Sequence, residues 1–237
     1  MEHLDLTFGA AAANLACDEA LLDSCEAGSG AEVLRFWEPQ HCFVVAGYSN
    51  VLAKEVNLPA CRRAGIGIFR RCSGGGAVLQ GQGSLNYSLA LRIDDCPPLQ
   101  TISGANRHIM ERHRGALAAL LRQPVDVMGI TDLALGGLKF SGNAQRRKRR
   151  ALLFHGTFLL HFDLPLMDQF LNLPSRQPDY RQNRPHHCFV MNLNVPASAI
   201  KTALRDVWQA HTPLHAAPDC RRLMAEKYTR DDWNLKF

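Results

Sequence analysis

Residues 70–78 read Arg-Arg-Cys-Ser-Gly-Gly-Gly-Ala-Val, and the plan of the chain is best understood outward from these three consecutive glycines. Glycine inside a strand or helix costs roughly 0.5–1 kcal/mol relative to alanine, so three in a row favour neither element. They favour backbone that adopts positive φ or lies directly against a ligand. Because two arginines and a serine add charge and a hydroxyl, the stretch predicts either an anion-binding loop or a flexible turn between strands.

The segments on both sides of this loop predict strands. Residues 66–71 lead into the loop and residues 85–91 leave it, and both segments are rich in apolar residues. Elsewhere, helical and strand patterns occur without regular alternation, which favours an α+β fold with a mixed, largely antiparallel sheet and flanking helices. The sequence shows no repeat and no long linker, so we expect one domain over residues 1–237.

The remaining elements follow from the apolar periodicity. Ser103 is expected to be the N-cap of a helix, since a serine side chain accepts hydrogen bonds from unpaired backbone N–H groups. Residues 172–187 have three prolines and little periodicity, so they predict a long loop of the kind that often has a function. In the tail, Trp233 and Phe237 are expected to pack back onto the body. The predicted helices are 10–27, 58–64, 103–121, 164–171 and 197–209, and the further strands are 33–37, 42–48, 152–160 and two short strands within 132–142.

The composition is that of an ordinary globular protein, with 46% hydrophobic and 21% charged residues in 237. No apolar run of about 18 residues occurs and no signal peptide is visible, so we expect no membrane partner and a cytoplasmic location. Much of the net charge of +5 lies in residues 146–150, Arg-Arg-Lys-Arg-Arg. This run predicts a solvated loop or a docking patch for an acidic protein or an anionic cofactor. Because no aromatic residues are interleaved with it, a nucleic-acid partner is not expected.

The spacing of cysteines and histidines does not predict a metal centre. The eight cysteines include no Cys-x-x-Cys pair, and we expect most of them to be buried free thiols. The ten histidines include no His-Glu-x-x-His motif. His186 and His187 are adjacent, which on a strand would point them to opposite faces.

A second polar constellation lies at residues 139–145, Lys-Phe-Ser-Gly-Asn-Ala-Gln. A lysine at a strand end is ordinarily exposed. Opposite an anion-binding loop, however, Lys139 would neutralise charge that develops on phosphate or carboxylate oxygens. Asp132 would hold Mg²⁺, orient Lys139 or lie in solvent, and His155 is either a core histidine or a site residue.

The glycine stretch matches none of the common nucleotide motifs. It lacks the Gly-Lys-Ser/Thr of a P-loop, and its spacing differs from that of the dinucleotide fingerprint. A Gly-x-Ser-x-Gly nucleophile elbow is also missing. Generic motifs therefore indicate only an anion-binding loop of unassigned type.

Taken together, these segments resemble one family. Residues 70–78, with Gly-x-Leu-Asn-Tyr-Ser at 83–88, look like the signature of the lipoate–protein ligase and octanoyltransferase family. Residues 139–145, followed by His-Gly-Thr at 155–157, are similar to its catalytic-lysine segment. Residues 35–37 and 44–50 also fit, so the resemblance runs from about residue 10 to residue 195.

The resemblance implies a fold like that of the biotin/lipoate ligase catalytic domain, which is related to class II synthetase cores. It also implies a reaction in two steps, in which lipoate and Mg·ATP give lipoyl-AMP and a carrier lysine then takes the lipoyl group. Lys139 would be the catalytic residue, Asp132 a Mg²⁺ ligand, and the strand at 43–46 one wall of an acyl tunnel. The implied substrate and adenylate contacts are Arg70, Ser73, Gly74, Gly75, Gly76, Ala77, Asn86, Asp132, Ser141, Gly142, His155, Gly156 and Thr157.

The chain departs from the family pattern in two places. Many ligases have His-Asp where this sequence has Gln80-Gly81, which changes the polar contacts of the loop. Larger ligases also have a C-terminal accessory domain, which we do not expect here, so a separate accessory subunit would be one alternative. The implied partners are lipoyl carrier proteins, such as 2-oxoacid dehydrogenase E2 or the glycine cleavage H protein.

Two alternatives to the ligase remain open. Octanoyltransferases of the family use no ATP and form a thioester on a cysteine. At the position where one branch has this cysteine, residues 172–175 read Asn-Leu-Pro-Ser, while Cys72 and Cys188 lie elsewhere, so the sequence favours the ligase. The second alternative is a catalytically silent protein that binds lipoate or lipoyl-AMP.

Overall fold

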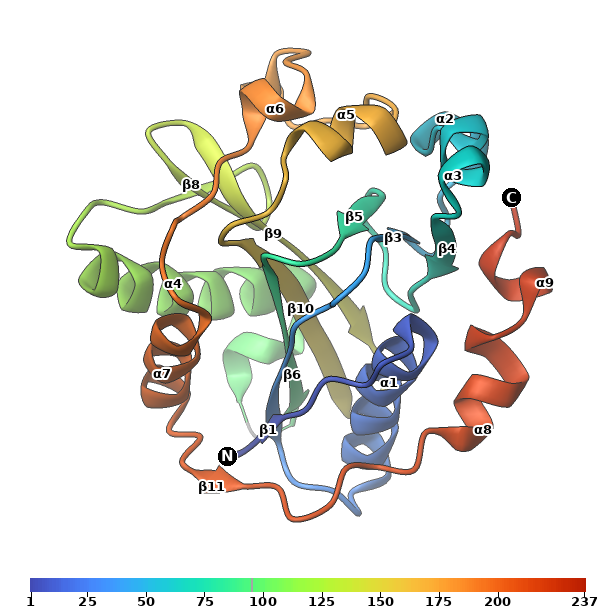
Figure 1. Cartoon of the computed structure of the whole chain (residues 1–237). Helices are drawn as coiled ribbons and strands as arrows, with labels where there is room; N and C mark the ends of the chain where they lie inside the picture. The colour runs from blue at the N-terminus through green and yellow to red at the C-terminus, as the bar shows by residue number, and fades with distance from the viewer. Residues whose placement is uncertain (95) are drawn as a thin grey trace.

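The computed structural model describes residues 1–94 and 96–237, and within these residues the strands form one sheet of eight and one of three (Figure 1). Pairing is antiparallel from β2 to β7, whereas β1 runs parallel to both of its neighbours. The predicted α+β fold with a mixed, largely antiparallel sheet is therefore confirmed. The larger sheet has the order β11 (Thr212–Pro213), β1 (Glu2–Asp5), β2 (Val33–Trp37), β6 (Ser84–Arg92), β10 (Ala151–Leu159), β9 (Leu138–Arg147), β8 (Asp132–Leu135) and β7 (Asp126–Met128).

The smaller sheet holds the glycine stretch. Its order is β4 (Gly67–Arg70), β3 (Phe43–Ala46) and β5 (Val78–Gln80), with β3 parallel to β4 and antiparallel to β5. Residues 71–77, which we call the glycine loop, connect β4 to β5. β5 was not predicted from the sequence, because three residues are too few to show a period.

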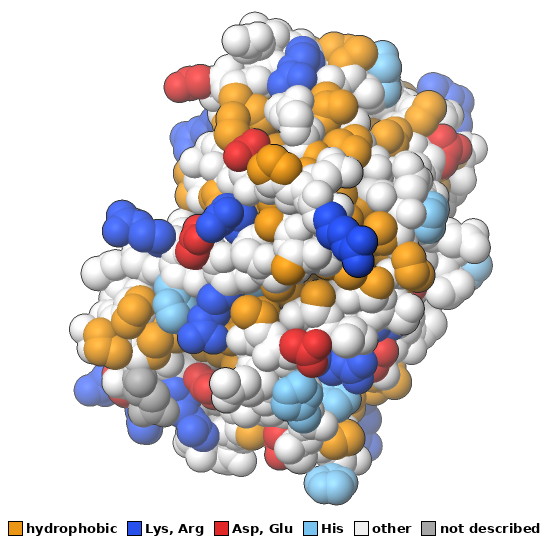
Figure 2. Space-filling view, turned by 90° about the vertical axis from the view of Figure 1, so that its left-hand side faces the viewer, with side chains coloured by type: hydrophobic (Ala, Val, Ile, Leu, Met, Phe, Trp, Pro, Cys, Tyr) orange, Lys and Arg blue, Asp and Glu red, His pale blue; other side chains and the backbone are white. Residues whose placement is uncertain are grey.

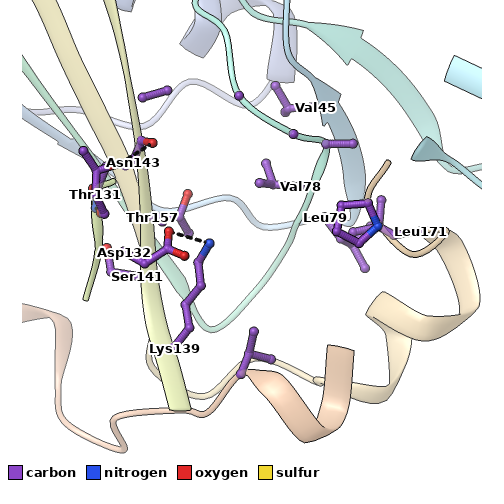
Figure 3. A pocket seen from close by; sticks show the side chains of 18 of the residues that line it. Val45, Val78, Leu79, Thr131, Asp132, Lys139, Ser141, Asn143, Thr157 and Leu171 are labelled. Carbon is purple, nitrogen blue, oxygen red and sulfur yellow. Dashed lines mark hydrogen bonds and ion pairs between the residues drawn. The ribbon is translucent and has the colours of Figure 1, made fainter. Parts of the chain in front are cut away.

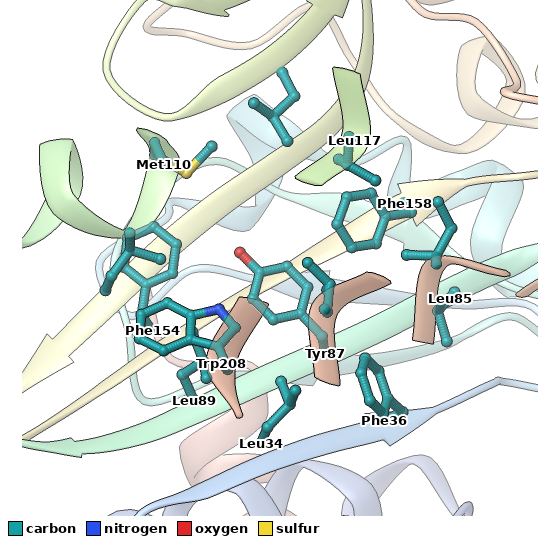
Figure 4. Packing of buried hydrophobic residues seen from close by; sticks show 14 of the residues in the cluster. Leu34, Phe36, Leu85, Tyr87, Leu89, Met110, Leu117, Phe154, Phe158 and Trp208 are labelled. Carbon is teal, nitrogen blue, oxygen red and sulfur yellow. The ribbon is translucent and has the colours of Figure 1, made fainter. Parts of the chain in front are cut away.

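Side chains of the central strands point alternately to the two faces of the larger sheet, and a separate hydrophobic core lies on each face. Leu85, Tyr87 and Leu89 of β6 point toward α4 (Ile102–Leu121) and α7 (Ala197–Trp208), where they pack with Met110, Leu117 and Trp208 (Figure 4). Ala90 of the same strand packs on the opposite face, against α1 (Ala11–Ala27). Since side chains alternate with period two, one strand serves both layers. The candidate site lies on the α1 side.

Glycines and a threonine side chain set the ends of the longer helices, and one predicted N-cap is wrong. Gly28 and Gly65 end α1 and α3 (Leu58–Ala64) in the left-handed conformation. The N-cap of α4 is Thr101, whose hydroxyl accepts from the Gly104 N–H at 3.0 Å, so the prediction of Ser103 is wrong. Both residues offer a hydroxyl, and the preceding turn, η1 (Pro97–Gln100), makes the helix start two residues earlier. The other helices are α2 (Leu52–Glu55), α5 (Pro165–Phe170), α8 (Arg221–Leu223), η3 (Met224–Tyr228) and α9 (Asp231–Asn234).

The segment predicted as a long loop contains two short helical turns, η2 (Asp179–Arg181) and α6 (His186–Phe189). His186 and His187 therefore lie on a helical turn and not on a strand. Prolines at 174, 178 and 185 keep these turns short. We call residues 171–190, which follow α5 and end where Val190 pairs with Lys139 of β9, the covering segment (Figure 1).

The C-terminal tail packs on β4 only in part as predicted. The Trp233 indole N–H donates to the Arg70 carbonyl at 2.8 Å, so this residue does pack back. Phe237 also packs back, since the carbon of the Arg70 guanidinium lies 5.7 Å from the centre of its ring, but the residue remains 66% exposed. Its carbonyl accepts from the Leu52 N–H at 3.0 Å, which fastens the end of the tail.

The basic run forms the tip of the β9–β10 hairpin rather than a free loop. Arg147 still belongs to β9, and its guanidinium donates to the Leu99 carbonyl at 2.8 Å. Lys148 pairs with Asp23 of α1 at 2.6 Å. On the face shown in Figure 2, basic side chains are scattered among acidic, apolar and polar ones. No helix of the described residues combines the length and apolarity needed to cross a bilayer.

Candidate active site

A cavity of about 590 Å³ lies between the larger sheet, the smaller sheet and the covering segment (Figure 3). The elements that surround it come from distant parts of the sequence, namely the glycine loop, β5, β8, β9, β10 and α5. Its volume is in the usual range for small-molecule sites. The predicted site residues that it brings together are Gly75, Gly76, Ala77, Asn86, Asp132, Lys139, Ser141, Gly142, His155, Gly156 and Thr157.

Arg71 shapes the glycine loop from inside. Its guanidinium donates to the carbonyls of Gly74 at 2.7 Å, Gly76 at 2.8 Å and Val45 at 3.3 Å. Gly75 has φ +88°, and a Cβ there would lie 2.8 Å from Arg71 Nη2, so only glycine fits. Burial lowers the Arg71 pKa to about 10. With its carbonyls turned to Arg71, the loop leaves the N–H groups of Gly75 and Gly76 without a hydrogen bond to any described residue.

Arg70 lies outside the cavity, which corrects the prediction that it holds the anion. Its fully buried guanidinium donates to the carbonyls of Gly47 at 2.8 Å and Asn50 at 3.0 Å, and also to the carbonyl of Lys236. Adjacent residues at a strand end point to opposite sides, and the sequence alone does not say which arginine faces the site. Arg70 fastens the tail, whereas Arg71 lines the cavity.

Ser73 and Gly74 also lie behind the cavity wall. The Ser73 hydroxyl accepts from Arg71 Nε at 3.1 Å and shares a 2.5 Å hydrogen bond with His155 Nε2. Burial, reinforced by the Arg71 charge, lowers the His155 pKa to about 4. His155 is therefore neutral at pH 7, accepts the Ser73 proton and joins the glycine loop to β10.

Lys139 reaches into the cavity from β9, and its Nζ lies 2.8 Å from Asp132 Oδ1 (Figure 3). The other oxygen of Asp132 accepts from the Tyr180 hydroxyl at 2.8 Å. A Cβ at Gly142 would lie 2.7 Å from Lys139 Nζ, so the glycine gives the lysine room to lie across its own strand. Asp132 thus orients the lysine, which is one of the roles considered for it.

The arrangement does not favour Asp132 as a magnesium ligand. Both carboxylate oxygens already have protein partners, Lys139 and Tyr180. Among the described residues, no group of three or more His, Cys, Asp or Glu side chains could hold a metal ion. Mg²⁺ is ordinarily bound by one or two carboxylates together with substrate phosphates, so a magnesium ion here would have to arrive with a nucleotide.

The floor of the cavity is a closed polar network around Gln80. Its amide nitrogen donates to Thr157 Oγ1 at 2.7 Å, and its oxygen accepts from Asn86 Nδ2 at 2.9 Å. Thr157 in turn donates to Asn86 Oδ1 at 2.6 Å. Gln80, which stands where many ligases have His, therefore joins β5 to the larger sheet. Nearby, the buried hydroxyl of Ser141 has no partner among the described residues, which leaves it free for a ligand.

The rest of the cavity is apolar. Val45, Val78, Leu79 and Leu171 lie across from Lys139 (Figure 3). Of the strand expected to line an acyl tunnel, only Val45 reaches the cavity, because its neighbours Val44 and Ala46 point to the opposite side. An apolar chamber with a cation at one end suits a fatty acid-like substrate.

The covering segment supplies site residues that the sequence analysis missed. Arg181 and His186 line the cavity and are 5% and 8% exposed. Tyr180 holds Asp132, as described above. The only signal in the sequence was the prediction that 172–187 is a functional loop, since the segment has neither a recognisable motif nor a period.

Within the described residues the eight cysteines form no disulfide and five of them are buried, which confirms the prediction. None of them is among the residues that line the cavity. Burial raises the Cys72 pKa to about 12, so this thiol is not activated. Cys188 is exposed on α6.

The family model of the lipoyl protein ligase A/B catalytic domain matches residues 10–208, which include every wall of the cavity. The chain belongs to this family. The lipoyl ligase A/B match confirms the resemblance seen in residues 70–88 and 139–157.

Relatives of this lipoyl ligase A/B domain have two kinds of name. Octanoyltransferase LipM of Lysinibacillus sphaericus is 28% identical over 94% of both chains. Lipoate-protein ligase A subunit 1 of Thermoplasma acidophilum is 26% identical over 94% of this chain and 91% of that protein. The family is therefore shown, and the names do not decide between ligase and transferase.

Solved structures of similar proteins show the same fold. A T. acidophilum protein named as a candidate lipoate protein ligase, with bound lipoic acid, superposes with a TM-score of 0.83 at 26% identity, covering 99% of this chain and 98% of that one. Lipoate-protein ligase A bound with ATP gives a TM-score of 0.80 at 27% identity, covering 99% of both chains.

Proposed function

We propose that this protein is an ATP-dependent lipoate–protein ligase, which makes lipoyl-AMP and transfers the lipoyl group to a lysine of a carrier domain. The observation that carries the proposal is Lys139, held by Asp132 at the polar end of an apolar cavity whose described walls contain no cysteine. The similarity to a lipoic acid-bound protein and to an ATP-bound ligase supports it.

In the first step, a lipoate carboxylate oxygen attacks the α-phosphorus of ATP and pyrophosphate leaves. The apolar walls around Val45 and Leu171 accommodate the dithiolane ring and its chain. The Lys139 ammonium and the free N–H groups of Gly75 and Gly76 supply fixed positive charge for the phosphate oxygens. Mg²⁺ would arrive bound to the phosphates of ATP.

In the second step, the carrier lysine attacks the acyl carbon of lipoyl-AMP. The C–N bond forms, the bond from the acyl carbon to the phosphate oxygen breaks, and AMP leaves with the electron pair. Lys139 stabilises both the carbonyl oxygen and the departing phosphate, because one ammonium can donate to both.

The partners follow from this chemistry. The acceptor is a lipoyl carrier domain, such as that of a 2-oxoacid dehydrogenase E2 or the glycine cleavage H protein. The relative named as subunit 1 of a ligase makes a separate accessory subunit part of the proposal.

Octanoyl transfer without ATP is the second candidate, and the LipM relatives favour it. It needs a thiolate beside Lys139. Cys72 and Cys188 each adjoin a lining residue in the sequence, Arg71 and Phe189, and of these two thiols only Cys188 is exposed. Under the ligase proposal, the Cys188→Ser variant retains full activity.

Mass spectrometry of an apo E2 lipoyl domain tests the proposal. The domain is incubated with the protein, lipoate and Mg·ATP, and in parallel with octanoyl-acyl carrier protein without ATP. We expect the mass of one lipoyl group to be added only when ATP is present, with Cys72→Ser and Cys188→Ser as active as the wild type. Pyrophosphate release measures the first step, and added lipoyl-AMP isolates the second, so the second step can be measured without an accessory subunit.

Two results would contradict the ligase, and a third would contradict only its proposed site. Octanoylation from the acyl carrier protein without ATP, lost in Cys188→Ser, would establish the transferase. Binding of lipoate without modification of the carrier under any of these conditions would establish the silent binding protein. Modification that needs ATP but not Lys139 would leave the reaction intact and remove the proposed site.

A further inference from the structure

The covering segment contains a carboxylate–histidine pair that neither the family motifs nor the two-step scheme uses. His186 Nδ1 lies 3.2 Å from Asp168 Oδ1, and the backbone N–H of His186 donates to the same oxygen at 2.8 Å. The Asp168 carboxylate is only an acceptor, because hydrogen bonds from His187 and His186 hold its pKa below the usual value against the opposing effect of burial. His186 Nδ1 therefore carries the proton, and Nε2 has the lone pair.

His186 is also part of the cavity wall. The residue is 8% exposed and lines the cavity, and its Nε2 forms no hydrogen bond with any described residue. The ring is thus held through Nδ1, and Nε2 is available to a ligand. Catalytic bases are commonly held in this way, with a third group orienting the base.

The position of His186 relative to Lys139 is set by the backbone. The Val190 N–H donates to the His186 carbonyl at 3.0 Å, and Val190 forms a parallel bridge with Lys139. The Met191 N–H donates to the Lys139 carbonyl at 2.9 Å. One helical turn therefore separates His186 from the strand that carries the lysine.

The charges that face the imidazole come from three elements. Asp168 belongs to α5, Arg181 to η2 and Lys139 to β9, while His187 follows on the same turn as His186. Burial and the positive charge of Arg181 lower the His186 pKa below 6.5, and Lys139 adds to this effect. The ring is therefore neutral at pH 7, as a proton acceptor must be.

We propose that His186 is the base that takes a proton from the attacking carrier lysine, with Asp168 as its positioning residue. The inference rests on the proposed function, because it concerns the second step of that reaction. The lysine ammonium first loses one proton to solvent. As the neutral amine forms the C–N bond, its nitrogen becomes positive, and one N–H proton passes to His186 Nε2. The bond between the acyl carbon and the phosphate oxygen breaks, AMP leaves with the electron pair, and the imidazolium returns its proton to solvent.

The test compares the two half-reactions in His186→Gln and His187→Gln. Glutamine at 186 retains polar contact with Asp168 but offers no base. His187 is the matched control, since its Nδ1 lies 2.5 Å from the same aspartate but its ring is exposed and does not line the cavity. Pyrophosphate release gives the rate of adenylate formation, and added lipoyl-AMP with an apo E2 lipoyl domain gives the rate of transfer.

We expect the ratio of transfer to adenylate formation to fall about 10²-fold in His186→Gln and to stay within threefold in His187→Gln. The wild-type transfer rate should rise with pH through a limb below pH 6.5, and this limb should disappear in His186→Gln. Imidazole added to His186→Ala should restore part of the transfer rate, which a structural role would not allow. An unchanged ratio, or a loss of the same size in His187→Gln, overturns the inference.

This design separates two kinds of failure. If the wild type neither releases pyrophosphate from lipoate and ATP nor transfers the lipoyl group from added lipoyl-AMP, the proposed ligase function fails. Amide formation by a carrier lysine is common to ligase and transferase, so the same variants are then assayed with octanoyl-acyl carrier protein. A 10²-fold loss confined to His186→Gln would support the base in that case, and equal rates would overturn it.

Discussion

Two walls of the cavity are built in different ways. The glycine loop is held by hydrogen bonds to its own backbone, since Arg71 donates to three carbonyls around it. The covering segment instead reaches the site with side chains, of which Tyr180 and His186 contact Asp132 and Asp168. The first wall is fixed by local sequence, whereas the second depends on partners far along the chain. A motif therefore marks the first wall and not the second.

The largest loss of activity should follow from replacing Lys139, the cation at the polar end of the cavity. Replacing Lys139 by alanine removes the cation from the polar end of the cavity, and we expect adenylate formation to fall about 10²–10³-fold. Since the lysine side chain is 27% exposed, the fold should remain stable. Pyrophosphate release and thermal unfolding measure the two effects.

Lys148→Ala is the matched control for this variant. Lys148 also pairs with an aspartate, Asp23, and its side chain is 33% exposed, but it lies at the hairpin tip away from the cavity. It should keep wild-type activity. Equal losses in the two variants would show that the effect is one of general charge and not of the site.

Arg71→Gln tests the first wall alone. Glutamine cannot reach all the carbonyls that the guanidinium satisfies, and unsatisfied buried acceptors cost about 1–3 kcal/mol. We expect the free energy of unfolding to fall by about 3 kcal/mol and the KM for lipoate to rise, while the covering segment keeps its contacts. Urea unfolding and steady-state kinetics measure both. A variant as stable as the wild type would show that the loop does not depend on Arg71.

A short pattern was enough to mark the first wall in the sequence. Gly75 does a job there that only glycine can do, although Ser73 and Gly74, which were also expected to contact the ligand, lie behind the cavity wall. The prediction went wrong at Arg70, because two adjacent arginines are chemically alike and only the packing of the tail on β4 decides which one turns inward. Residue type was predictable, but the direction of the side chain was not.

The residues of the second wall could not be predicted from the sequence, for a different reason. Tyr180, Arg181 and His186 lie in a segment without apolar period, where neither helix nor strand spacing relates one residue to the next. Their partners, Asp132 and Asp168, are 48 and 18 residues away. Only the folded chain shows that these residues face one cavity.

Acid should weaken the first wall through His155. Its pKa is about 4 in the folded protein and about 6.5 in the unfolded chain, so the unfolded chain binds more protons between these values. The contribution of neutral His155 to the free energy of unfolding is therefore fully present above pH 6.5 and is lost as the pH falls toward 4. Between pH 7 and pH 4.5 this loss amounts to about 2 kcal/mol. Urea unfolding at both pH values should show this loss in the wild type and a smaller one in His155→Gln. Equal losses in both proteins would mean that His155 is already protonated in the fold.

The smallest effect, Tyr180→Phe, is the sharpest test of the second wall. The variant removes one hydrogen bond to Asp132 and leaves the Lys139–Asp132 ion pair in place. A hydrogen bond of this kind contributes about 1 kcal/mol, which corresponds to roughly a fivefold fall in kcat for adenylate formation. Tyr228→Phe is the matched control, because the Tyr228 hydroxyl donates to Glu19 at 2.5 Å, outside the cavity. If the covering segment positions the lysine through Asp132, only Tyr180→Phe lowers kcat, although both variants lose stability. If both keep the wild-type kcat, Asp132 orients Lys139 without help from Tyr180, and the contribution of the covering segment to the site reduces to Arg181 and His186.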